Sequence, residues 1–100
     1  MIHVIWQFIV KAEAVAQFEQ AYGPEGAWAN LFKPYPGFTR TSLLRDSSRP
    51  HTYLTIDVWE SRAQRDAMLA DAKTEYAALD TECAGWTESE TELGVFEVVG

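Results

Sequence analysis

The order in which strand-like and helix-like periodicity alternate is the feature that most restricts the fold of this chain. β-Branched and aromatic residues in strand-like patterns occupy residues 2–10, 38–46, 53–61 and 93–99. Apolar residues recur with helical spacing over 12–22, over 24–33 after the break at Gly23-Pro24, and over 61–83. The resulting βαββαβ order predicts an α+β, ferredoxin-like domain, in which a four-stranded antiparallel sheet carries its helices on one face.

Length and charge limit the possible roles of such a domain. One hundred residues, 47% of them apolar, are enough for one hydrophobic core, so residues 1–100 are expected to form a single domain. The formal net charge of −7 argues against nucleic acid and anionic membrane as partners, because both require clustered Lys and Arg. The acidic run from Thr81 to Glu97 is interpreted as a solvated rim.

Two local features bear on location and reactivity. The apolar start, MIHVIWQFIV, has no positive region and is too short to span a bilayer, so it predicts a first strand and a cytoplasmic protein. The single cysteine, Cys83, is expected to be a small buried residue near a helix end. His3 and His51 have no ligand-spaced partner, so we expect no metal site.

The strand YLTIDVWES has two very different faces. Alternation places Leu54, Ile56 and Val58 on one face, which is expected to pack against the helices. The other face carries Tyr53, Thr55, Asp57 and Trp59. We expect this second face to point away from the helices and to be covered by a second copy of the chain, which predicts a homodimer.

The long helix has a clear beginning and a clear buried stripe. Ser61, followed three residues later by Gln64, predicts a capping box. The expected stripe recurs every three or four residues: Met68, Ala72, Tyr76, Leu79 and Cys83.

Several stretches together resemble the antibiotic biosynthesis monooxygenase (ABM) family. They are VIWQFIV, FEQAYGPEGAWANLF, PGFTRTSLLRD, YLTIDVWES and EYAALDTEC, and they cover almost the whole chain. The resemblance implies a dimeric α/β barrel with a pocket in each subunit. It leaves the reaction open, because the superfamily includes cofactor-independent quinone-forming monooxygenases, quinol-directed enzymes, haem-degrading oxygenases and members with no demonstrated activity.

Only some of the family's functional residues have a match here. Trp59 matches a Trp that both the haem-degrading and the quinone-forming members carry near the end of the third strand. Gln7 lies near the position of a pocket Asn, and Thr55 stands where the quinone-forming enzymes have another Asn. The helix stretch RAQRDAMLADAKTEY contains no His to ligate haem iron, so we expect no haem. We expect no other cofactor either, because the anion of an electron-rich aromatic substrate reacts with oxygen directly.

Asp57 is the leading candidate for a catalytic group. A carboxylate in an enclosed pocket has a raised pKa and is able to take a phenolic or quinol proton. The structural alternative is an ion pair with Arg40 or Arg45, or a hydrogen bond with Thr41. The sequence leaves both interpretations open.

Other candidates would shape or bind a substrate. Trp59 is interpreted either as a flat wall for an aromatic ring or as interface packing. Arg40 would hold an anionic oxygen beside Asp57 if a bulge near Leu43-Leu44 turned it inward. Four further side chains are candidates for the pocket or its mouth: Gln7, Tyr53, Tyr35 and Phe38.

Three functions therefore compete. The first is a cofactor-independent monooxygenase acting on a small phenol, quinol or anthrone in a pocket between sheet and helices, with Asp57 as base and Trp59 beside it. The second is a dimeric domain that binds a small aromatic or lipid-like molecule without transforming it. The third is a structural dimer whose inner face is filled by side chains, as four Trp residues in so short a chain would allow.

Overall fold

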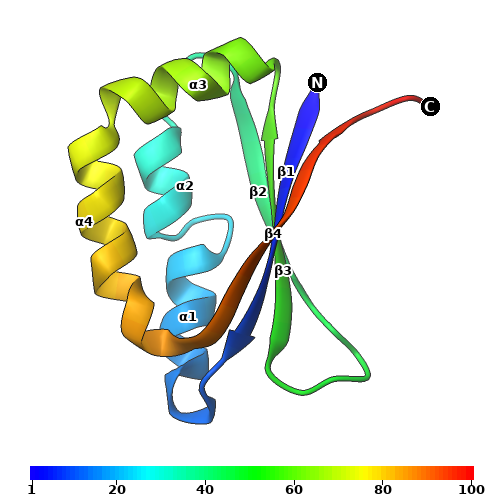
Figure 1. The fold of residues 1–100 in the computed structure, drawn as a ribbon, viewed down its shortest axis with the longest axis vertical. Helices are drawn as coiled ribbons and strands as arrows, with labels where there is room; N and C mark the ends of the chain where they lie inside the picture. Colours follow the sequence, from blue (N-terminus) through cyan, green and yellow to red (C-terminus); the bar gives the residue numbers. More distant parts are fainter.

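The computed structural model describes all 100 residues and confirms the predicted ferredoxin-like fold (Figure 1). One antiparallel sheet with the strand order β2-β3-β1-β4 is covered on a single face by the helices. Its strands are β1 (Ile2–Val10), β2 (Phe38–Arg45), β3 (Thr52–Trp59) and β4 (Thr87–Glu97). The helices are α1 (Val15–Tyr22), α2 (Ala27–Phe32), α3 (Arg62–Asp71) and α4 (Lys73–Cys83), with short 3₁₀ turns at Ala12–Ala14 and Ala84–Trp86. No helix combines the length and apolar character needed to cross a bilayer.

The faces of the sheet are the reverse of those predicted for β3. Tyr53, Thr55 and Asp57 lie on the helix side, and Leu54 and Ile56 lie on the outer side. The reason is that the helices contribute mostly large rings to the interior, and these rings pack against other rings of the sheet. Aromatic side chains fill the space between the sheet and the helices, whereas short aliphatic side chains would leave voids there.

The core is a continuous row of aromatic contacts between sheet and helices. Phe8 of β1 lies 5.3 Å from Phe18 of α1, measured between ring centroids, and Phe18 stacks on Tyr22 at 4.2 Å. At the other end of the row, Phe32 of α2 lies 5.7 Å from Trp59 of β3. Each such pair contributes about 0.5–1.5 kcal/mol beyond the burial of its area, so this row fixes the distance between the two layers.

The helix predicted over 61–83 is correctly capped but consists of two parts. The Ser61 hydroxyl accepts a hydrogen bond from the Gln64 backbone N–H at 3.2 Å, as the sequence predicts. At Ala72, with φ −93° and ψ 20°, the chain leaves helical geometry, and α4 turns sharply away from α3 (Figure 1). All five residues of the predicted stripe still contact the core. Ala72 is buried at the bend, so the stripe continues from α3 into α4.

Strand β4 begins six residues earlier than predicted. Its first half is the acidic run, in which Glu90 pairs with Phe8 and Glu92 with Trp6 of β1. The interpretation of this run as solvated is confirmed, since Glu88, Glu90 and Glu92 are exposed. β4 is an edge strand, and its first half is held by backbone pairing with β1. This half lacks the apolar alternation by which a strand is recognised in a sequence, so its start was predicted too late.

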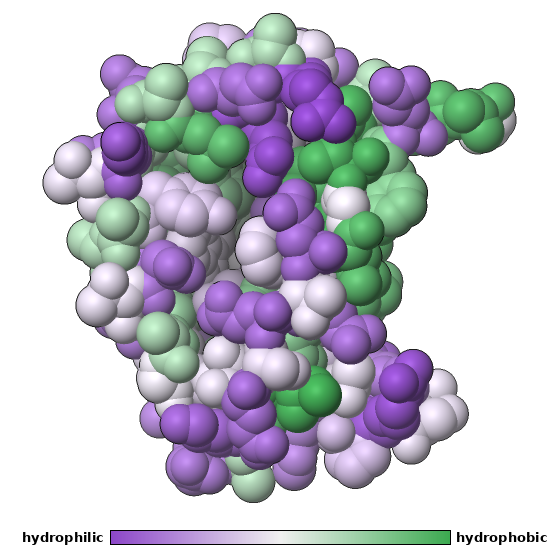
Figure 2. Space-filling view, in the orientation of Figure 1, coloured by the Kyte–Doolittle hydropathy of each residue, from purple (hydrophilic) through white to green (hydrophobic).

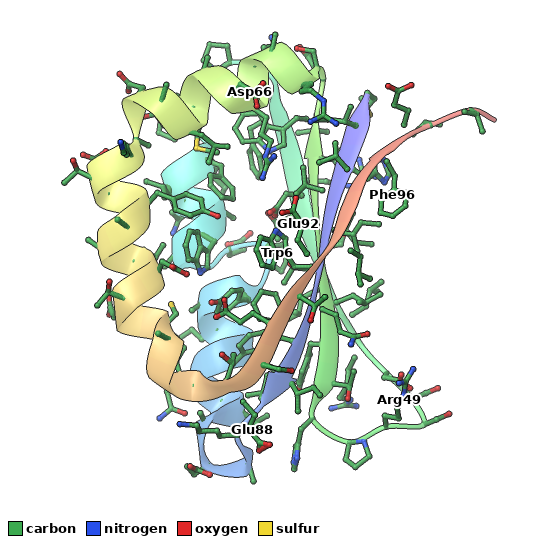
Figure 3. All side chains as sticks on the ribbon, viewed as in Figure 1. Trp6, Arg49, Asp66, Glu88, Glu92 and Phe96 are labelled. Atoms are coloured by element: carbon green, nitrogen blue, oxygen red, sulfur yellow. The ribbon has the colours of Figure 1, made fainter.

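The outer face of the sheet is apolar and exposed. Trp6 and Phe96 lie on opposite sides of the sheet (Figure 3), and the apolar side chains gather along the outer side in Figure 2. This outer face includes Ile9, Leu44, Leu93 and Phe96, which are between 37% and 48% exposed. An apolar surface of this kind on a monomer marks an interaction site.

The junction between α1 and α2 requires a glycine. A Cβ atom on Gly26 would overlap the backbone carbonyl oxygens of Gln20 and Ala21, which cannot move without distorting α1. Gly26 therefore lets the two helices approach closely and so sets the direction of α2.

We expect Gly26→Ala to lower the free energy of unfolding by at least about 2 kcal/mol, because the new methyl group meets backbone atoms. Gly85→Ala is the matched control: nothing lies within 4 Å of a Cβ there, so its effect should stay within about 0.5 kcal/mol. Urea unfolding of both variants measures this. Equal stability of the two variants would contradict the close approach described for Gly26.

Candidate active site

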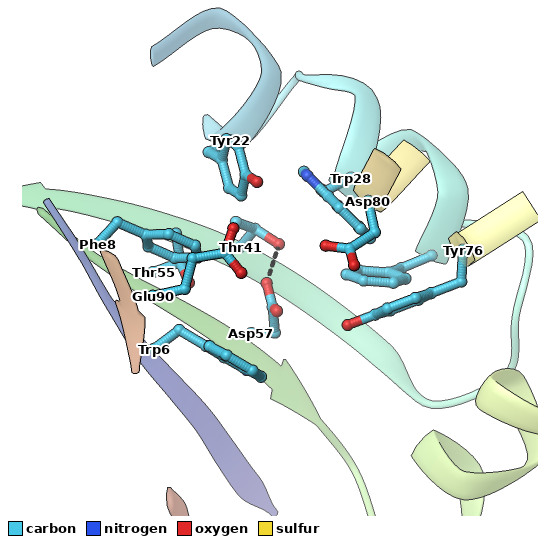
Figure 4. Close-up of a pocket in the computed structure, with 11 residues that line it drawn as sticks. Trp6, Phe8, Tyr22, Trp28, Thr41, Thr55, Asp57, Tyr76, Asp80 and Glu90 are labelled. Atoms are coloured by element: carbon cyan, nitrogen blue, oxygen red, sulfur yellow. Dashed lines mark hydrogen bonds between the residues drawn. The ribbon is translucent and has the colours of Figure 1, made fainter. Parts of the chain in front are cut away.

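A small cavity lies between the sheet and the helices, with a volume of about 50 Å³ (Figure 4). Six aromatic side chains form most of its wall: Trp6, Phe8, Tyr22, Trp28, Phe32 and Tyr76. The polar part of the wall consists of Thr41, Thr55, Asp57, Asp80 and Glu90. Asp80 of α4 and Glu90 of β4 are solvent-exposed, so the cavity opens between these two elements.

Asp57 is the buried polar centre of this cavity. It lies in the middle of β3, an interior strand, directly across from Thr41 of β2. The Thr41 hydroxyl donates a hydrogen bond of 2.7 Å to Asp57 Oδ1, whereas Oδ2 has no hydrogen-bond partner in the protein (Figure 4). Of the alternatives considered from the sequence, the hydrogen bond with Thr41 is present, and the ion pair with Arg40 or Arg45 is not.

The surroundings of Asp57 keep its carboxyl protonated to an unusually high pH. Burial raises its pKa to about 6 from an ordinary value of 3.8, while the Thr41 hydrogen bond and the charge of Arg65 oppose the rise. The cavity thus holds a carboxyl group that exchanges its proton near neutral pH, which is the range useful for acid–base chemistry.

Unlike Asp57, the two tyrosines of the wall do not exchange their protons near neutral pH. Burial raises the pKa of the Tyr22 hydroxyl far above its ordinary value, and burial also raises that of Tyr76. Both phenols remain protonated at any physiological pH, so each acts as a hydrogen-bond donor and neither acts as a base.

The ionisable carboxyl side chains give the lining of the cavity a single sign of charge, although the positive charge of Arg65 also reaches Asp57. The cavity wall contains the three carboxyl groups of Asp57, Asp80 and Glu90 and no Lys, Arg or His. Such a wall repels anionic ligands and accepts neutral or cationic ones.

Of the candidate residues predicted from sequence, only Asp57 and Thr55 line the cavity. Trp59 lies on the helix side of the sheet, the reverse of its predicted facing, but it is only 1% exposed and is packed between Phe32 and Phe38. Phe38 is thus a core neighbour of Trp59 and not part of the cavity. The Tyr53 hydroxyl donates to Glu19 at the far end of β3.

Three other candidates lie away from the cavity. Gln7 and Arg40 project from the outer face, since Gln7 pairs with Leu54 and Arg40 with Val58. The register shift in β2 falls between Phe38 and Arg40 and not at Leu43-Leu44, so it leaves Arg40 facing outward. Tyr35 lies in the turn after α2, where its hydroxyl donates to Asp71 at 2.7 Å.

Most of the wall was not recognised as a site from the sequence. Trp6 and Phe8 share one face of β1, and Tyr22, Trp28 and Tyr76 lie on apolar helix faces, so all five have the pattern of ordinary core residues. Asp80 and Glu90 carry no signal in the sequence, because only the packing of α4 beside β4 brings them together.

The chain contains no group of three His, Cys, Asp or Glu side chains arranged to hold a metal ion. Cys83 is buried at the end of α4, as predicted, and its pKa is raised by burial. Cys83 does not line the cavity, and among the three carboxyl groups that do, Asp57 is the one whose pKa is raised by burial.

Comparison with known proteins identifies relatives of this fold. The family model described as antibiotic biosynthesis monooxygenase matches residues 1–76. A variant of SnoaB, a cofactor-independent oxygenase from Streptomyces nogalater, superposes with a TM-score of 0.82 at 24% identity, covering 99% of this chain and 93% of that chain. A provisionally assigned antibiotic biosynthesis monooxygenase from Nitrosomonas europaea gives a TM-score of 0.72 at 17% identity, with 100% of both chains covered. A search by sequence against curated proteins finds no significant match.

The raised pKa of Asp57 predicts an unusual pH dependence of stability. Between the ordinary pKa of 3.8 and the folded value of about 6, the folded protein holds a proton that the unfolded chain has lost. The free energy of unfolding contributed by Asp57 therefore falls as the pH rises through this window and is level above it, with a total change of about 3 kcal/mol.

Asp57→Asn removes this contribution and keeps an acceptor for Thr41. Subtracting the two stabilities cancels every other titrating group, so wild type should lose about 1 kcal/mol relative to Asp57→Asn between pH 5 and pH 8. Urea titrations at both pH values measure the difference. A stability difference that does not change with pH would mean that Asp57 titrates at its ordinary value.

Proposed function

The chain belongs to the antibiotic biosynthesis monooxygenase family, and we propose that it is a cofactor-independent monooxygenase that oxidises a small electron-rich aromatic in this cavity. The substrate class is a phenol, quinol or anthrone. The observation that carries the proposal is Asp57: a buried carboxyl group, with a pKa of about 6 and one oxygen free, in a cavity walled by aromatic rings.

Asp57 acts first as a base. Its free oxygen takes the hydroxyl proton of the substrate and leaves an electron-rich aryl oxide. The anion transfers an electron to O₂, and the two radicals combine to form a peroxide on a ring carbon. Asp57 returns its proton to the outer oxygen of the peroxide. The ring carbon then loses its proton as the O–O bond breaks, and the departing hydroxide takes up this proton and leaves as water, which gives a quinone. The substrate loses two hydrogens and gains one oxygen atom, and O₂ supplies both that atom and the oxygen of the water.

The pKa of Asp57 suits both steps. A carboxyl group with a pKa near 6 is ionised at neutral pH, yet it is basic enough to share a proton with a phenol held in an apolar site. An ordinary carboxylate is ionised equally but is a weaker base by about two powers of ten, which makes the proton transfer correspondingly less favourable. The aromatic wall contributes by excluding water and by holding the ring of the substrate.

The cavity must widen to admit a substrate. Its volume of about 50 Å³ compares with roughly 300–1,000 Å³ for typical ligand pockets. The exposed side chains of Asp80 and Glu90 at the mouth are the ones free to move, so the opening occurs between α4 and β4. The small volume is also the observation that favours the second candidate function, a packed domain that forms a dimer without catalysis.

The same proposal includes a homodimer. The outer face of the sheet exposes Ile9, Leu44, Leu93 and Phe96, and a second copy of the same flat apolar face would cover it. The two sheets would then pack face to face, with each cavity on the helix side of its own sheet. The cavity is therefore complete within one subunit, in keeping with the pocket in each subunit that the resemblance to the family implies.

The catalytic proposal predicts a specific pH profile. Oxygen uptake is measured with a panel of quinols, phenols and anthrones as substrates, and kcat/KM should rise with pH through an apparent pKa near 6, because the base must be ionised. Asp57→Asn should lower kcat/KM at least about 100-fold. Thr41→Val removes the hydrogen bond that stabilises the carboxylate, so it should move the profile to higher pH while activity persists.

Glu88→Gln is the matched control for these variants, since Glu88 is an exposed carboxylate of β4 that does not line the cavity. Its profile should coincide with that of wild type. Turnover that survives in Asp57→Asn would remove Asp57 from the mechanism, and absence of oxygen uptake across the whole panel would favour the packed, non-catalytic dimer.

The dimer is tested by a charge on the outer face. Leu93→Asp should convert the protein from dimer to monomer in light scattering after size exclusion, because a carboxylate buried between two apolar sheets has no partner. Ala78→Asp, on the exposed side of α4, adds the same charge elsewhere and should leave the dimer intact. A monomeric wild-type protein at micromolar concentration would overturn this part of the proposal.

A further inference from the structure

One buried polar atom of the chain has no partner. The indole Nε1 of Trp28 is shielded from solvent and has no hydrogen-bond acceptor, and it is the only such side-chain atom in the protein. The residue itself is 7% exposed and lines the cavity. Leaving an N–H group unpaired in the interior costs free energy, and native proteins rarely tolerate it.

Packing alone does not require this N–H. The Trp28 ring contacts Tyr22, Phe32 and Tyr76, with centroid distances of 5.9, 6.1 and 4.9 Å. A phenylalanine would make ring contacts of the same kind without burying a donor. The N–H is therefore a feature that the core does not need and that a ligand in the adjoining cavity would use.

A second donor lies beside it. Figure 4 shows the nitrogen of Trp28 turned toward the hydroxyl of Tyr22, above the cavity, while Asp57 and Thr41 lie below on the sheet. The Tyr22 hydroxyl lies near the side chains of Trp28 and Cys83, both of which influence its pKa, and the phenol stays protonated. The helix wall of the cavity thus presents two donors, whereas the sheet wall presents the free oxygen of Asp57, an acceptor when ionised.

We propose that Trp28, assisted by Tyr22, binds an oxygen acceptor of the ligand on the helix side of the cavity, across from Asp57. The inference rests on the proposed function, because it takes Asp57 as the partner of the substrate hydroxyl. It restricts the substrate to aromatics that carry two oxygens on opposite sides of the ring: a hydroxyl for Asp57 and a carbonyl or second oxygen for Trp28. Where the second oxygen is a carbonyl conjugated with the ring, negative charge spreads to it as the hydroxyl proton leaves, so the two donors stabilise the anion.

The test uses two phenols of similar shape. 4-Hydroxyacetophenone carries a carbonyl acceptor across the ring from its hydroxyl, and 4-ethylphenol does not. Isothermal titration calorimetry with both compounds should show that wild type binds the ketone about 3- to 10-fold more tightly, the usual effect of one net hydrogen bond. Trp28→Phe keeps an aromatic wall without the donor and should abolish this preference.

Two measurements keep the result independent of folding defects. The indole ¹H–¹⁵N signal of Trp28 in the wild-type protein should move downfield with the ketone and stay nearly unchanged with 4-ethylphenol. Trp86→Phe makes the same substitution outside the cavity and should retain the full preference. A wild type without preference, a preference that persists in Trp28→Phe, or no binding of either phenol at millimolar concentration would each overturn the inference.

The Asp57→Asn variant separates this inference from the catalytic proposal. It should bind both phenols more weakly by a similar factor and keep the preference for the ketone, because Trp28 is unchanged. A retained preference without any oxygen uptake by wild type would support the donor site and overturn the monooxygenase. Oxygen uptake by wild type without a preference for the ketone would support the monooxygenase and overturn the donor site at Trp28.

Discussion

The row of aromatic rings between the sheet and the helices is the interaction on which the rest of the structure depends. Rings from β1, β3, α1 and α2 meet at centroid distances between 4.2 and 6.1 Å, and these contacts set the separation of the two layers. Beside Asp57, several of these rings form the wall of the cavity. The site is thus a local gap in the core, and its shape follows from the same contacts that stabilise the fold.

Periodicity predicted the order of elements correctly because each element has its own local pattern. The Ser61 cap, the strand Ile2–Val10 and the stripe from Met68 to Cys83 all depend on neighbours in sequence. The choice of which face of β3 points toward the helices does not depend on neighbours in sequence. Alternation shows that two sets of side chains lie on opposite faces, but the choice between them depends on what the helices bring, and here they bring rings. The bend at Ala72 and the early start of β4 depend likewise on tertiary packing and on backbone pairing.

The candidate site was predictable only at its centre. Asp57 stood out because a carboxylate is unusual in a central strand, and the hydrogen bond from Thr41 follows from the pairing of β2 with β3. The remaining wall comes from β1, α1, α2, α4 and β4, and no sequence spacing links these elements. Gln7 was predicted to lie in the site from the resemblance to the family, and Arg40 from an assumed bulge. The observed register places both side chains on the outer face.

Three features that lower stability occur together in this one place. Asp57 is a buried carboxyl that forms no ion pair, Trp28 has an N–H without an acceptor, and a cavity lies beside both. Each would be removed without harm to the fold by an apolar side chain of suitable size. A domain selected only for stability has no reason to collect all three, and departures of this kind are expected where a protein binds or transforms a ligand. An acceptor and a pair of donors on facing walls of an aromatic cavity match a ring with an oxygen at each end, which is the physical basis for assigning a ligand to this site.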